Sequence, residues 1–194
     1  MRNLIKSILA ILLVTGVSIF AQDEDYSKYP GYVDFGDLSV FENGEEVTEV
    51  LIDHNLLKMV AKFTKGRDED SQELSNLLNG LQLIRVNTFE VSPSNKSELI
   101  AKVKKIEKDL KKQNWQRMVK AKSKDEITNI FLKTDENTDQ IIGLAIMSID
   151  SDGEASFVNI VGNIDMETIG KLSNKFDIPG LDTLNNKNKM PGSK

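Results

Sequence analysis

Three apolar segments in close succession constrain the fold of this chain more than any other feature. They are EITNIFLKT (126–134), IIGLAIMSID (141–150) and ASFVNIVGNI (155–164). Branched and aromatic residues dominate them and short polar connections separate them, which is typical of antiparallel strands. In the last segment apolar and polar residues alternate, so we expect a sheet with one buried face. The alternating residues are Val158, Ile160 and Ile164 on one side, and Asn159 and Asn163 on the other.

Upstream of these strands, apolar residues recur at helical spacing. The segment Glu45–Thr64 predicts a first helix that is apolar on two opposite sides. One stripe contains Val47, Val50, Leu51, Leu57 and Ala61, and the other contains Ile52, Leu56, Met59, Val60 and Phe63. Such a helix is either sandwiched between two layers or presents one stripe to a partner.

The rest of the chain supplies one more strand and three more helices. SQELSNLLNGL (71–81) predicts a second helix, and LIRVNTFEV (83–91) predicts a strand. Asn95 is an expected N-cap for a third helix that ends near Trp115, and Asp165 is one for a final helix. The order is therefore ααβαβββα. It predicts an α+β domain with a mainly antiparallel sheet of about four strands packed with helices.

The acidic stretch SIDSDGEAS (148–156) is the first candidate for chemistry. With Gly153 as the sixth position of an EF-hand loop, the first position is Ser148 and the twelfth is Asn159, so both anchoring carboxylates are missing. A hydrolytic carboxylate pair needs side chains that converge on a pocket, whereas Asp150, Asp152 and Glu154 lie around a turn. Asp-Gly between apolar segments instead indicates a hairpin, because glycine accepts positive φ.

Other candidate residues have structural interpretations too. His54 is the only histidine, and we expect a half-buried, hydrogen-bonded imidazole rather than a metal ligand. We expect Trp115 to pack at a helix end. The third helix carries a lysine face that either is solvated or meets an acidic partner or lipid head groups. Its lysines are Lys102, Lys104, Lys105, Lys108, Lys111 and Lys112.

No sequence motif assigns a catalytic, cofactor-binding or metal-binding residue. The chain lacks a phosphate-binding glycine loop, a Gly-x-Ser-x-Gly elbow and a metal motif. With no cysteine and one histidine, nucleophile–base catalysis has few candidate members. The net charge of −5 argues against nucleic acid as a partner.

The N-terminus has the parts of a secretory signal peptide. Arg2 and Lys6 precede an apolar run that ends at Ala21, and this run is short for a membrane span. We therefore expect cleavage near Ala21 and a periplasmic or secreted protein. The predicted organisation is a signal peptide (1–21), an acidic leader (22–44), one domain (45–178) and a disordered tail (179–194). Within the leader, YVDFGDLSVF (32–41) is expected to form an edge strand or to lie over the fold.

The second half of the chain resembles a known family. NWQRMVKAKSKDEITNIFLKT (114–134), IIGLAIMSIDSDGEASFVNIVGNIDMETIGKL (141–172) and the preceding lysine-rich helix are similar to domain-of-unknown-function family 4252. The resemblance covers roughly residues 45 to 176. SIFAQ (18–22) is similar to export signals of Bacteroidetes. The resemblance implies an exported protein of that phylum and brings no established activity and no catalytic residues.

These observations favour a non-catalytic binding or interaction module of the bacterial cell envelope. Its expected partner is an envelope protein or a small ligand. Two alternatives remain: a hydrolase that uses Asp150, Asp152 or Glu154, and a membrane-apposed structural protein held by an uncleaved signal or by the lysine face.

Overall fold

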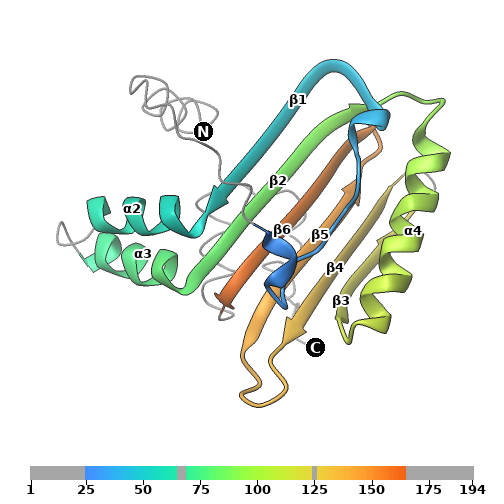
Figure 1. Ribbon diagram of the computed structural model, residues 1–194. Coiled ribbons are helices and arrows are strands. Elements are labelled where there is room, and N and C mark those ends of the chain that lie inside the picture. The colour runs from blue at the N-terminus through green and yellow to red at the C-terminus, as the bar shows by residue number, and fades with distance from the viewer. Residues whose placement is uncertain (1–24, 65–68, 124–125, 165–194) are drawn as a thin grey trace, which may run out of the picture.

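Six strands form a single antiparallel sheet in the order β1-β2-β6-β5-β4-β3 (Figure 1). The computed structural model describes residues 25–64, 69–123 and 126–164. The strands are β1 (Glu42–Asp53), β2 (Leu81–Val91), β3 (Gln116–Lys122), β4 (Ile127–Thr134), β5 (Ile141–Ile149) and β6 (Glu154–Ile164). The helices are α2 (His54–Thr64), α3 (Glu69–Gly80) and α4 (Lys96–Lys112), with short 3-10 turns at Tyr26–Lys28 and Ser39–Phe41.

The predicted sheet of about four strands and the predicted order ααβαβββα are both wrong. The strands expected at 83–91, 126–134, 141–150 and 155–164 are present as β2, β4, β5 and β6, but β1 and β3 flank them. The predicted first helix over Glu45–Thr64 is strand β1 followed by helix α2. The predicted stripe residues Val47, Val50, Leu51 and Ile52 belong to β1, where they are divided between the two faces of the strand.

The switch from strand to helix has a local cause. Val50 and Ile52 lie opposite Val86 and Ile84 of β2, so branched side chains match across the pair. The Asp53 carboxylate then accepts a hydrogen bond from the Leu56 backbone N–H at 2.8 Å. A carboxylate that receives an N–H in the first turn is an N-cap, so α2 begins immediately after Asp53.

One face of the sheet is covered by α4 and by the N-terminal strap, which we define as residues 25–41 (Figure 1). YVDFGDLSVF (32–41) thus lies over the fold. The buried residues of the strap are Val33, Phe35, Leu38 and Phe41, and those of α4 include Leu99, Val103 and Leu110. Phe157 of β6 lies at the centre, with its ring centroid 5.4 Å from that of Phe35 and 6.1 Å from that of Phe89.

A buried asparagine fastens the strap to the sheet. The Asn159 side chain on β6 accepts a hydrogen bond from the Val33 N–H at 2.9 Å. Its amide group donates to the carbonyl oxygens of Gly31 at 3.0 Å and Leu144 at 3.1 Å. The strap approaches β5 so closely that a Cβ on Gly31 would lie 2.0 Å from the Ile142 oxygen. Only glycine fits at position 31.

The opposite face packs against α2 and α3. Leu57 and Ala61 of α2 and Leu78 of α3 belong to one apolar cluster with residues of the sheet. The sheet contributes Leu81, Ile130, Leu132, Leu144, Ile146, Val158, Ile160 and Ile164. Because β6 is also buried on the α4 face, the expectation of one buried face is wrong: the central strands are buried on both.

Several predictions concern residues outside the described ranges. They are the signal peptide (1–21), the final helix that begins after Asp165, and the tail (179–194). Among the described residues, no helix is long and apolar enough to span a bilayer.

Candidate functional site

The acidic stretch at 150–154 is the turn of the β5–β6 hairpin, as predicted. The Asp150 backbone N–H donates to the Glu154 backbone carbonyl oxygen at 2.9 Å, and the Asp150 carboxylate accepts from the Glu154 backbone N–H at 2.9 Å. Gly153 has φ +95°, which disfavours a side chain. Asp150 therefore braces the turn with both its backbone and its side chain.

Glu154 lies among other carboxylates at this end of the sheet. It is directly opposite Glu90 of β2. Burial raises the pKa of Glu154, and the charges of Asp150, Glu90 and Glu46 raise it further. In the described part of the chain, however, no three His, Cys, Asp or Glu side chains are arranged to hold a metal ion. These carboxylates therefore repel one another electrostatically.

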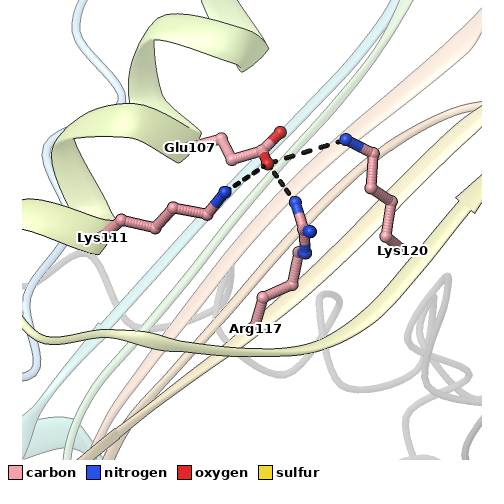
Figure 2. A network of polar contacts seen from close by, with 4 residues as sticks. All are labelled: Glu107, Lys111, Arg117 and Lys120. Atoms are coloured by element: carbon pink, nitrogen blue, oxygen red, sulfur yellow. Dashed lines mark hydrogen bonds and ion pairs between the residues drawn. The ribbon is translucent and has the colours of Figure 1, made fainter.

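A second polar cluster joins α4 to the edge strand β3 (Figure 2). One carboxylate oxygen of Glu107 contacts three cations: the Lys111 ammonium at 3.1 Å, the Arg117 guanidinium, and the Lys120 ammonium at 3.7 Å. The Glu107 side chain is 10% exposed, so these cations neutralise a nearly buried charge.

A β-bulge places both strand cations on the same face. Arg117 and Lys120 are three residues apart, so they would lie on opposite faces of a regular strand. The pairing of β3 with β4 shifts between Arg117 and Val119, and this extra residue turns Arg117 and Lys120 toward α4. The irregularity is thus what assembles the cluster.

The Glu107 cluster is electrostatically stable at neutral pH. Burial alone raises the pKa of Glu107, but the hydrogen bond from Lys111 and the charges of Lys120, Lys111 and Arg117 outweigh it, so the pKa falls below its ordinary value. A carboxylate held ionised by three cations is a poor proton donor or acceptor at pH 7. The cluster therefore attaches α4 to β3 through ion pairs.

The other lysines of the predicted lysine face divide into two groups. The Lys102 ammonium donates to the Asp37 carbonyl and lies 5.5 Å from the Phe41 ring centroid, so it holds the strap. Lys112 pairs with Asp109 at 2.8 Å. Lys104, Lys105 and Lys108 are exposed.

His54 and Trp115 have structural positions. The His54 Nδ1 lies 3.2 Å from the Leu81 carbonyl oxygen and the residue is half-buried, as predicted. Trp115 is 3% exposed, and a Cβ on Gly143 would lie 2.7 Å from its ring. Its indole N–H has no hydrogen-bond partner among the described residues.

Sequence reasoning missed a shallow depression of about 260 Å³ where the strap meets β1 and β2. A polar chain lines it. The Arg85 guanidinium donates to the Tyr32 hydroxyl at 3.4 Å and to the Asn87 side chain at 3.2 Å, and Asn87 donates to Glu49 at 2.5 Å. The signal was available, because Arg85 and Asn87 are polar residues two positions apart in a strand and therefore lie on the same face.

Seven large apolar side chains are exposed among the described residues. They are Val40, Val47, Leu51, Met59, Val60, Phe63 and Met118. Three of them, Met59, Val60 and Phe63, form one stripe of α2, which we call the α2 stripe. The other stripe of this helix, with Leu57 and Ala61, is buried against the sheet. Among the described residues, one apolar side of this helix is therefore packed and the other is exposed.

Comparison with known proteins adds the family. Searches of curated proteins and of solved structures found no match. A family model described as "Domain of unknown function (DUF4252)" matches residues 41–172, which is 132 of the 194 residues. The match begins at the end of the strap and includes all six strands. The chain therefore belongs to the DUF4252 family.

Proposed function

We propose that this protein is a non-catalytic interaction module of the bacterial cell envelope, and that it binds a protein partner through the α2 stripe. The observation that carries the proposal is the exposure of this stripe: Met59 is 49%, Val60 45% and Phe63 71% exposed. All three lie on one helix whose other apolar side is already packed. A contiguous exposed apolar patch is typical of an interaction site.

The energy available from Phe63 is substantial. An aromatic side chain buries about 150–250 Å² on full burial. With 71% of Phe63 exposed, a partner would cover roughly 100–180 Å². At about 25 cal/mol per Å² this contributes roughly 3–4 kcal/mol to binding. A few fully buried side chains carry most of the binding energy of an interface, and Phe63 is large enough to be one of them.

The charges next to the stripe indicate the chemistry of the partner. Helix α2 carries Lys58 and Lys62 and contains no Asp or Glu. Both lysines are exposed. A partner groove with an apolar floor and an acidic rim fits this helix, as in other helix-in-groove complexes.

A photo-crosslinking experiment in the producing cell tests the proposal. A photoreactive amino acid at position 63 should give a discrete protein adduct, and Met59→Ser in the same chain should remove it. The same amino acid at Lys104, an exposed position on α4, is the matched control. Failure to obtain an adduct specific to position 63 would contradict the proposal.

The envelope part of the proposal has a separate test. Mass spectrometry of the mature protein should find Gln22 as the N-terminal residue, and cell fractionation should place the chain outside the cytoplasm. A retained Met1 would instead support the membrane-apposed alternative. The hydrolase alternative requires that Asp150→Asn, Asp152→Asn and Glu154→Gln together abolish an activity while the fold persists.

A further inference from the structure

The two edge strands of the sheet carry opposite charges. Strand β1 contains five acidic residues and no basic ones: Glu42, Glu45, Glu46, Glu49 and Asp53. Strand β3 contains three basic residues and no acidic ones: Arg117, Lys120 and Lys122. Because β1 and β3 end the strand order, each has one edge without a partner strand in the described part of the protein.

Both edges are accessible. Six of the seven residues of β3 are exposed, including Met118 at 39%. On β1, Val47 is 43% and Leu51 is 50% exposed. These are the exposed large apolar side chains that the described strands carry, and all of them lie on the two edges. An open edge with apolar side chains is a template for another strand.

The topology makes the two edges geometrically compatible. Six strands with antiparallel neighbours alternate in direction, so β1 and β3 run in opposite directions. A second molecule placed beside β1, and rotated to follow the twist of the sheet, therefore brings its β3 antiparallel to β1 of the first. Both molecules then keep α4 on the same face of one continuous sheet.

The charged side chains also match in this arrangement. Glu49 is two residues from Val47, which lies opposite the buried Phe89, so Glu49 faces the α4 side. Lys120 contacts Glu107 of α4, and Lys122 is two residues further on the same side. Acidic and basic side chains thus meet on one face of the joined sheet.

Pairing of identical edges is disfavoured. Two β1 strands would bring acidic residues opposite acidic residues, and two β3 strands would bring basic residues together. Like charges directly opposite one another destabilise a strand pair, whereas opposite charges stabilise it by about 0.2–1 kcal/mol. The charges therefore disfavour symmetric dimers relative to the β1–β3 contact.

We propose that a second copy of this chain adds its β3 to β1, so that the protein associates head to tail into a continuous antiparallel sheet. Such a contact is heterologous and extends further at each free end. It does not use the α2 stripe and is independent of the function proposed above.

Sedimentation velocity of the exported chain, over a range of protein concentrations, tests the proposal. At low salt the sedimentation coefficient should rise with concentration. The rise should shrink in about 1 M salt, where the Debye length is about 3 Å. A monomer at every concentration would overturn the proposal.

Two charge-reversed variants make the test specific. Glu49→Lys changes an exposed residue on the α4 side of β1, and Lys122→Glu changes an exposed residue on the α4 side of β3. Each variant alone should need about tenfold more protein to associate, and an equimolar mixture should associate like the wild type. Lys104→Glu/Lys108→Glu on α4 is the control and should leave association unchanged.

The outcomes separate this inference from the proposed function. If the β1 and β3 variants associate like the wild type, or if the α4 control loses association equally, edge pairing is wrong. Crosslinking from position 63 is unaffected by either result. Circular dichroism should confirm that each variant is folded, and the mixture experiment should recover association only from folded chains.

Discussion

Two buried asparagines on the same sheet should lose very different amounts of stability on the same substitution. Asn159 on β6 and Asn129 on β4 are both 0% exposed. Asn159 makes three hydrogen bonds that join the strap to the sheet. The side-chain oxygen and nitrogen of Asn129 have no partner among the described residues. The pair therefore separates the effect of hydrogen bonding from the effect of burial.

Replacement of Asn159 by alanine removes three hydrogen bonds. Each contributes about 0.5–1.5 kcal/mol net, and the loss of the Asn159 acceptor for the Val33 N–H places the total at the upper end. We expect Asn159→Ala to lower the free energy of unfolding by about 3–4 kcal/mol. Asn129→Ala removes a buried amide that itself costs about 1–3 kcal/mol, which offsets the lost packing, so we expect a change below about 1 kcal/mol.

Urea unfolding followed by the fluorescence of Trp115 provides the measurement. This residue is the only tryptophan and is 3% exposed. Chymotrypsin adds a local readout, because Asn159→Ala should expose Tyr29, Tyr32 and Phe35 of the strap to cleavage before the sheet unfolds. Equal losses of stability in the two variants would refute the reasoning, as would a loss below about 1 kcal/mol for Asn159→Ala.

Three further predictions concern charge and backbone contact. Glu107→Gln should lower the free energy of unfolding by about 1–3 kcal/mol at pH 7. Because the folded-state pKa of Glu107 is lowered, this difference between variant and wild type should shrink as the pH drops below about 4.5. Urea unfolding at several pH values measures it. Glu154→Gln should raise stability at pH 7 by about 0.2–1 kcal/mol. Because the folded-state pKa of Glu154 is raised, the wild type loses stability as the pH rises through that pKa, so the gain of the variant should vanish near pH 4 in the same assay. A gain that does not depend on pH would contradict the assignment. Gly31→Ala should release the strap, since its Cβ would lie 2.0 Å from the Ile142 oxygen, whereas Ala at position 80, where the nearest atom is 3.1 Å away, should cost less; the order of the two unfolding midpoints tests this.

The sequence predicted the interior of the sheet and missed its edges. Strands β2, β4, β5 and β6 have branched residues and buried or half-buried positions along most of their length, which makes their pattern visible. Strand β3 is exposed almost throughout and contains a bulge, so QRMVKAK has neither an apolar run nor a regular alternation. Strand β1 was mistaken for a helix because β1 and α2 together imitate two helical stripes.

The polar clusters show the same limit. The hairpin at Asp150 was predictable because its turn chemistry is local. The Glu107 cluster was not, because its members come from α4 and β3 and converge only through the bulge near Met118. In the sequence Glu107 merely interrupts a run of lysines. The clamp at Asn159 depends on a contact between residues 126 positions apart, which no local pattern reveals.

That long-range clamp has a consequence for the order in which the molecule acquires structure. Ribosomes make the amino-terminal residues first, and at about 5–20 residues per second the stretch from Val33 to Asn159 requires roughly 6–25 s. Throughout that interval the strap can contact β2 and α4 but lacks its central partner, since β6 has not yet been synthesised. The apolar residues of the strap therefore remain partly exposed on the nascent chain until β6 has been synthesised. Any factor that protects them from aggregation must act before the sheet is complete.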